Sequence, residues 1–174
     1  KECEKNRAPY KKKTELAREM IDVLVDWTER RIEVAADSAY CNATVMRGLP
    51  ERVHLFGAMR PDAVLTALPH ARKQSGAGRP RRRGKLLPKP EVIASDQRVP
   101  WQSCKVFVYR RKRVVQYKTL CAQWYRACGT RLLRIVIVKT ERGAVPFRVF
   151  FGTDASQDVS TIIAGYGARW SIEC

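Results

Sequence analysis

Hydrophobic residues near the start of the chain recur with the spacing of an amphipathic helix. Five large apolar side chains share this period: Leu16, Met20, Val23, Leu24 and Trp27. Thr14 stands before them as a cap, and Glu15 and Glu19 near the start suit the helix dipole. The pattern predicts a helix that follows Thr14 and extends to Trp27.

Two short apolar runs follow, and each predicts a buried strand. The first, residues 32–37, ends on Asp37, and the second covers residues 53–59. Between them, residues 37–46 predict a short helix that Gly48 and Pro50 stop. The order helix, strand, short helix, strand is typical of an α/β domain with a partly parallel sheet.

The second half of the chain carries strand patterns in pairs. Residues 104–109 and 114–117 predict two strands joined by a turn of four cations, and residues 132–138 and 145–151 predict a hairpin around 141–143. Residues 71–90, rich in Gly, Pro and Arg, predict little regular structure. A final helix is predicted from an apolar stripe of Val159, Ile162, Ile163, Tyr166 and Trp170.

These elements predict an α/β fold in four parts. Residues 1–13 form a polar lead-in, and residues 14–62 form one part of the core. Residues 63–151 form a basic loop followed by a β-rich insertion. Residues 152–174 return to the core as an acid-bearing helix.

The net charge of +17 is confined to one internal region of the chain. Residues 63–140 hold 19 Lys and Arg and two acids, whereas the other segments hold 15 cations and 15 acids and are neutral. A localised basic surface of this kind predicts a polyanion as partner. No stretch approaches the roughly 18 apolar residues that a bilayer span needs, so no membrane partner is expected. The six cysteines form no C-x-x-C pair, which predicts reduced cytosolic thiols and no zinc site.

Two cationic runs are the candidates for phosphate contact. The densest, in the Gly- and Pro-rich stretch, comprises Arg79, Arg81, Arg82, Arg83 and Lys85, and the second comprises Arg110, Arg111, Lys112 and Arg113. A solvated linker or a localisation-type tract is the plain interpretation of the first run. The cationic bias continues into the structured neighbours on either side, and this favours phosphate contact.

Candidate chemistry lies at Asp37 and at the end of the last helix. On a helix, Tyr166, Arg169 and Glu173 project from one face, with Trp170 beside them. Carboxylates suit a hard cation, Arg suits a phosphate, and aromatic rings stack on bases. An amphipathic helix with one exposed ion pair would give the same spacing.

A two-metal phosphoryl-transfer site needs carboxylates from different elements around cations about 4 Å apart. Asp37 at a strand end and Glu173 on a helix meet that requirement. Asp154 is a competing acid, but Gln157 three residues later indicates a capping box for the last helix. We expect Asp154 to lie near the amide of Ser156 or Gln157.

These segments together resemble the insertion-sequence DDE transposases of bacteria. Val34-Ala-Ala-Asp37-Ser-Ala-Tyr40 is similar to the second-Asp motif of that family, and residues 78–88 are similar to a linker between its two halves. Thr153-Asp154 before the last helix, and Tyr166-x-x-Arg169-Trp170-x-x-Glu173, resemble the terminal-acid signature, known as the YREK signature.

The resemblance implies an RNase H-like core with a β-rich insertion, in which Asp37 and Glu173 are catalytic and metal-binding carboxylates. It implies a two-metal site with Mg²⁺ or Mn²⁺, and cleavage and strand transfer of double-stranded DNA at transposon ends and targets. A homodimer in a synaptic complex and a cytoplasmic, nucleoid-associated location would accompany this activity.

The resemblance also leaves two positions without a match. The first Asp of the family lies on an earlier strand, and nothing before Thr14 matches it; the Lys that follows the Glu is not found either. We therefore interpret the chain as an internal fragment with two of three acids, which by itself should not cut DNA. The alternative is a non-catalytic, basic nucleic-acid-binding fragment, a remnant of a decayed transposase.

Overall fold

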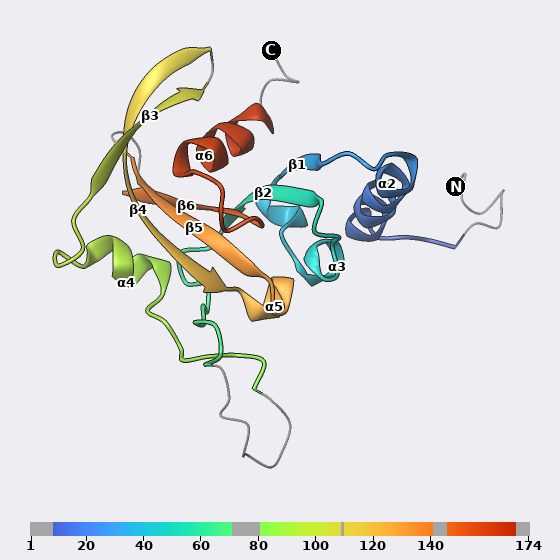
Figure 1. Ribbon diagram of the computed structural model, residues 1–174, viewed down its shortest axis with the longest axis horizontal. Helices are drawn as coiled ribbons and strands as arrows, with labels where there is room; N and C mark the ends of the chain where they lie inside the picture. The colour runs from blue at the N-terminus through green and yellow to red at the C-terminus, as the bar shows by residue number, and fades with distance from the viewer. Residues whose placement is uncertain (1–8, 71–80, 109, 141–145, 170–174) are drawn as a thin grey trace.

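A computed structural model describes residues 9–70, 81–108, 110–140 and 146–169. A single mixed sheet of six strands runs through the molecule in the order β1-β2-β6-β5-β4-β3 (Figure 1). Its strands are β1 Ile32–Ala36, β2 Val53–Met59, β3 Gln102–Val108, β4 Arg111–Gln123, β5 Leu132–Lys139 and β6 Phe147–Gly152. Strands β1 and β2 are parallel, and every other neighbouring pair is antiparallel. This mixed, curled sheet is compatible with an RNase H-like domain.

Helices precede, connect and follow the strands; those at residues 13–27, 38–46 and 159–167 lie close to predicted positions, whereas those at 90–95 and 125–128 were not predicted. The helices are α2 Lys13–Trp27, the 3-10 turn η1 Ser38–Tyr40, α3 Ala43–Met46, α4 Pro90–Ser95, α5 Tyr125–Cys128 and α6 Val159–Gly167. Helix α2 is capped at Lys12 instead of Thr14, because the Glu15 side chain accepts the Lys12 backbone N–H at 2.8 Å. The Asn42 side chain accepts the N–H groups of Thr44 and Val45 and so starts α3.

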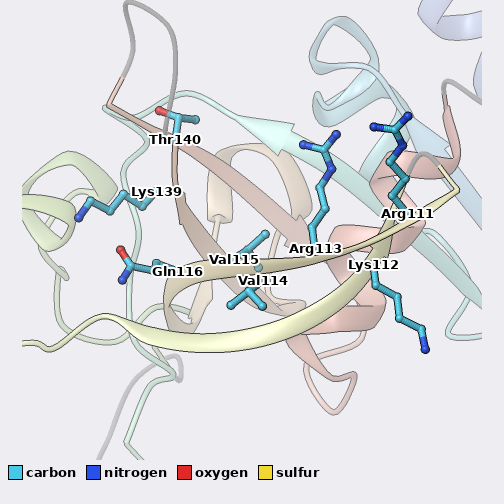
Figure 2. Close-up of a pocket in the computed structure, with 8 residues that line it drawn as sticks. All are labelled: Arg111, Lys112, Arg113, Val114, Val115, Gln116, Lys139 and Thr140. Atoms are coloured by element: carbon cyan, nitrogen blue, oxygen red, sulfur yellow. The ribbon is translucent and has the colours of Figure 1, made fainter.

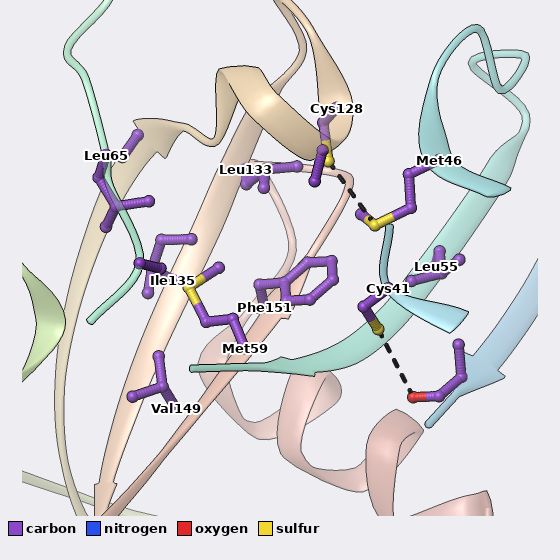
Figure 3. Close-up of a cluster of buried hydrophobic side chains, with 14 of the residues drawn as sticks. Cys41, Met46, Leu55, Met59, Leu65, Cys128, Leu133, Ile135, Val149 and Phe151 are labelled. Carbon is purple, nitrogen blue, oxygen red and sulfur yellow. Dashed lines mark hydrogen bonds between the residues drawn. The ribbon is translucent and has the colours of Figure 1, made fainter. Parts of the chain in front are cut away.

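The two faces of the sheet carry separate apolar clusters. Helices α2 to α5 contribute to one cluster, which is built on Leu55, Ile135 and Phe151 of the strands. Figure 3 shows part of it, where the Cys128 thiol of α5 lies 3.9 Å from the Met46 sulfur of α3. Helix α6 covers the opposite face, and Ile162 packs there in a cluster with Val136 and other strand residues. Alternate residues of each strand therefore serve opposite faces.

Strand β4 has 13 residues, whereas its neighbours β3 and β5 have seven and eight. The part of β4 that extends beyond β5 forms a projecting ribbon with β3. Residues 117–123 of β4 pair with β5, whereas residues 111–116 pair only with β3. We call β3 together with residues 111–117 of β4 the arm. In Figure 1 the arm curves over α6. The sequence prediction placed residues 110–113 in a turn; that placement is wrong for Arg111, Lys112 and Arg113, which belong to β4.

The predicted insertion strands do not form a sheet of their own. Strands β3 to β6 continue the sheet of β1 and β2, because β6 pairs with β2. The predicted boundaries at residues 13, 62 and 151 remain predictions. Within the described residues, no helix is long and apolar enough to cross a bilayer.

The apolar stripe that predicted α2 is largely open to solvent. Only Ile21 of this helix is buried, whereas Met20 and Trp27 are 69% and 79% exposed. Leu16 and Leu24 line a shallow hollow with Ile32 and Val34 of β1, which is the last strand on that side of the sheet. The helix prediction is confirmed, but amphipathic spacing alone did not determine what the stripe would pack against.

Candidate functional site

Asp37 lies where β1 ends and the chain turns into η1. Its Oδ1 accepts the Ser38 backbone N–H at 2.6 Å, which starts the 3-10 turn. Its Oδ2 lies 2.9 Å from Nη1 of Arg169, which follows α6. The side chain stays 49% exposed. Asp37 is thus a fixed but accessible carboxylate held between two elements that are far apart in sequence.

Tyr166 and Arg169 lie on the same side of α6, as their spacing predicts. The Tyr166 ring packs on Phe150 of β6 with 4.7 Å between centroids. The Arg169 guanidinium lies 5.3 Å from the Tyr166 ring centroid. Burial raises the pKa of the Tyr166 hydroxyl. The Tyr166 ring thus lies between the Phe150 ring and the Arg169 guanidinium.

Two glycines allow α6 to approach both the sheet and the arm. A Cβ on Gly165 would lie 2.5 Å from the Phe56 ring, and a Cβ on Gly167 would lie 3.1 Å from Cγ1 of Val108. Because Gly167 contacts β3 and Arg169 contacts Asp37, the end of α6 joins the arm to the Asp37 carboxylate.

Three predicted site residues, Arg79, Trp170 and Glu173, lie outside the described residues. The predicted approach of Asp37 and Glu173 therefore remains a prediction. So does the predicted projection of Arg169 and Glu173 from one helix face.

Asp154 lies away from Asp37 and interacts with other residues. It follows β6, and Thr153 donates its backbone N–H to Leu55 of β2, so this acid lies near the start of β2. The neighbouring His54 is opposite Glu33 of β1, four residues before Asp37, or about 13 Å along an extended strand. The competing acid is therefore at the other end of the strand from Asp37.

The Asp154 carboxylate accepts the Ser156 N–H at 2.9 Å and the Ser156 hydroxyl at 2.6 Å, as the sequence predicts. These hydrogen bonds hold the pKa of Asp154 below its usual range. The predicted capping box is wrong, however. The α6 cap is Asp158, and Asp154 closes a local turn before it. His54 lies with its Nδ1 3.2 Å from the Asp154 carboxylate, and burial lowers the pKa of the His54 ring.

The described residues of the two cationic runs lie at opposite ends of β4. Residues 81–85 lie beside the end of β4, because Thr66 pairs with both Leu86 and Gln123. There Arg83 stacks on the Tyr125 ring at 4.8 Å. Arg110 to Arg113 lie at the start of β4, up to about 40 Å away along its 13 residues. The chain thus has two separate basic surfaces.

The basic surface on the arm borders a hollow of about 810 Å³. It lies where β5 ends and β4 continues without it, and its walls include Arg111, Arg113 and Lys139 (Figure 2). In Figure 2 the Arg111 and Arg113 side chains extend to one side of β4, and Lys112 and Val114 extend to the other. The four cations form one group in the sequence, but β4 divides Arg111, Lys112 and Arg113 between two faces.

Arg148 of β6 also lies on the α6 face of the sheet, and it was not among the predicted site residues. Arg148 pairs with Val138, whose side chain belongs to the cluster under α6, so Arg148 lies on the α6 face. Its charge also acts on Tyr166. The signal was present in strand alternation, since Arg148 stands two residues before Phe150, another residue under α6.

The profile of the DDE superfamily endonucleases matches residues 1–125 of the chain. The chain belongs to this family. It was matched by no curated protein and by no solved structure. The matched region includes Asp37 and the whole arm but ends before α6, so it does not extend to the terminal-acid signature.

Membership of this family implies transposase-like nuclease activity, a DNA substrate and divalent metal ions. The Asp37 carboxylate fits such an ion by donor type, because hard cations prefer oxygen ligands. Within the described part of the chain, however, no group of three His, Cys, Asp or Glu side chains could hold a metal. Asp37 is thus one ligand of the right chemistry and not a complete metal site.

Proposed function

We propose that the chain is the central-to-C-terminal part of an insertion-sequence transposase catalytic domain. The intact protein would cleave DNA strands and join them to a target with Mg²⁺ or Mn²⁺. The observation that carries the proposal is the Asp37–Arg169 contact. It brings the carboxylate of the family-matched region to the helix whose sequence carries the terminal-acid signature.

Asp37 and Glu173 are the side chains that would hold the metal ions. The metals would supply an activated water or hydroxyl and stabilise the leaving oxygen. Arg169 has the geometry to exchange its carboxylate partner for a phosphate oxygen, since a guanidinium binds both in the same way. Tyr166 orients Arg169 through ring contact. In this arrangement Arg169 holds the DNA backbone one helical turn from Glu173 while a phosphodiester bond breaks.

The test uses the full-length parent protein, a duplex carrying transposon ends, and Mg²⁺. Asp37→Asn and Glu173→Gln should each abolish strand cleavage and leave duplex binding nearly intact, because each change removes a metal ligand and no cation. Arg169→Ala should weaken both cleavage and binding. Cleavage by the Glu173→Gln protein at close to the parental rate would contradict the catalytic assignment.

The second candidate function is that of a basic nucleic-acid-binding fragment without catalysis. It is supported by the incomplete ligand set at Asp37, since Asp37 belongs to no group of three His, Cys, Asp or Glu side chains among the described residues. Two observations separate the candidates. One is the coding sequence upstream, examined for an apolar strand that ends in Asp. The other is Mg²⁺-dependent nicking by the parent protein, which the fragment hypothesis excludes.

A further inference from the structure

The arm has two faces, and each is assigned by the register of its strands. Val106 and Val108 of β3 pack in the cluster under α6, together with Val115 of β4. Directly opposite residues of an antiparallel pair project to the same face. Val106 is opposite Arg113, and Val108 is opposite Arg111. Arg111 and Arg113 therefore belong to the α6 face of the arm.

The remaining cations of the arm belong to its outer face. Phe107, which is 62% exposed, is opposite Lys112, and Lys105 is opposite Val114. Lys105 and Lys112 thus project away from α6. Figure 2 shows this separation directly for Lys112 against Arg111 and Arg113. The α6 face carries arginines and the outer face carries lysines.

The cations of the α6 face have donors available for a ligand. Within the described residues, neither Arg111 nor Arg113 has an ion-pair or hydrogen-bond partner, and both are exposed. Successive residues on one face of a strand are about 7 Å apart, close to the spacing of neighbouring phosphates along a nucleic-acid strand. A guanidinium can also bind a phosphate with two parallel hydrogen bonds, which an ammonium cannot.

A continuous set of contacts connects these arginines to the Asp37 carboxylate. Arg111 is opposite Val108, and Val108 faces Gly167 of α6. Two residues later, Arg169 contacts Asp37. Arg148 lies on the same face of the sheet, near Tyr166. Arginines on the α6 face therefore stand both on the arm and beside the proposed catalytic carboxylate, around the apolar cluster that packs under α6.

We propose that Arg111 and Arg113, continued by Arg148, hold successive phosphates of the DNA strand that leads to Asp37, and that the outer face of the arm takes no part. This inference rests on the proposed function and makes it more specific. It identifies these arginines as positioning residues for the substrate backbone. It also predicts that DNA affinity depends on which face of the arm carries a cation, and not on the total charge of the arm.

The test compares two charge-matched double variants of the 174-residue chain. One is Arg111→Gln with Arg113→Gln, and the other is Lys105→Gln with Lys112→Gln; each removes two exposed cations from the same arm. Binding of a fluorescent 20-base-pair duplex is measured by anisotropy between about 50 and 300 mM KCl, without added metal. Thermal melts of both variants establish that the fold is kept.

The α6-face double should lose affinity on the order of tenfold near 150 mM KCl. The slope of log affinity against log salt should become shallower by about 1.8, because each lost phosphate contact accounts for about 0.9. Adding Arg148→Gln should reduce the slope by about 0.9 more. The outer-face double should keep the parental slope.

Equal losses in the two doubles, or a larger loss in the outer-face double, would overturn the inference while leaving the proposed function in place. Failure of the unaltered chain to bind duplex DNA at all would instead contradict the proposed function itself. Binding that falls in the α6-face double alone supports both.

Discussion

The arginines near the start of β2 and those of the arm carry the same charge but differ in their hydrogen-bond partners. Near β2, Arg131 donates to five backbone carbonyls, those of Leu49, Pro50, Glu51, Val53 and Thr153. Arg52 in the same region donates to Val25 and to the Glu29 carboxylate. On the arm, the described cations have no such partners. One group of arginines is committed to the fold, and the other is free to bind a ligand.

This contrast shows what a net charge can and cannot indicate. The sequence places +17 in residues 63–140, and Arg131 is counted in that sum. Its guanidinium is satisfied by the loop between α3 and β2 and by the turn after β6, and is not available to a phosphate. A basic surface is therefore defined by cations with unsatisfied donors, and the following changes test that distinction.

We expect the largest loss of stability from a substitution of Arg131. Arg131→Met should lower the free energy of unfolding by about 3 kcal/mol, because several partly buried carbonyls lose their donor at once. Arg113→Met, the matched change on the arm, should stay within about 0.5 kcal/mol. Urea denaturation of both variants provides the measurement. Similar losses from the two changes would show that the arm cations are structural too.

The next largest loss of stability is expected at Lys118, which can be compared with Lys112 of the same strand. Lys118 is buried, and its Nζ donates to the carbonyls of Ile93, Ala94 and Asp96 at 2.8–2.9 Å, at the end of α4. Lys118→Met should cost about 2 kcal/mol, since it leaves carbonyls at the helix end without a donor. Lys112→Met on the same strand should leave the urea midpoint unchanged. A stable Lys118→Met protein would mean that water replaces the ammonium.

Patterns of apolar residues predicted the elements well because each pattern depends on local geometry. The helix through Met20, the strand ending at Asp37 and the strand at residues 53–59 are all confirmed. Partners were not predictable in the same way. The 110–113 run has the composition of a turn, but Arg111, Lys112 and Arg113 pair with β3, and this pairing extends β4 through them. Pairing depends on the whole sheet, which no short window of sequence contains.

The candidate site was predicted in part for the same reason. Asp37 and Arg169 were each found from local spacing, yet their 2.9 Å contact joins residues 132 positions apart. Asp154 was correctly predicted to lie near Ser156, but it was assigned to a helix capping box, whereas it forms a local turn before the helix. A capping box and a local Asp turn use the same residue types, so the sequence does not separate them. Arg148 was missed because its importance comes from the face of β6 that it occupies.

Two glycines of α6 test how firmly this helix is held by the core and by the arm. Gly165→Ala should cost roughly 1–2 kcal/mol, because the new Cβ would overlap the buried Phe56 ring and this outweighs the gain in helix propensity. Gly167→Ala meets only the side chain of Val108 and should be neutral, or stabilising by up to about 1 kcal/mol. Thermal unfolding of the two variants checks the order. The reverse order would mean that α6 is fixed to the arm more rigidly than to the sheet.

The smallest expected effect is at the tip of the arm, where a cation is kept at a conformational cost. Arg110 has a φ of 58°, in the left-handed region that side chains other than Gly and Asn rarely occupy. Arg110→Gly should therefore raise the free energy of unfolding by up to about 1 kcal/mol, because Gly adopts this backbone without strain. The same change should weaken duplex binding about two- to threefold if the tip cation lies near a phosphate. Arg110→Asn tolerates the same backbone and also lacks the charge, so it should reproduce both effects, whereas Arg110→Lys should keep the binding and the strain. A gain in stability with unchanged binding in the Gly and Asn variants would show that the tip lies beyond the DNA, and that the contacting part of the arm begins at Arg111.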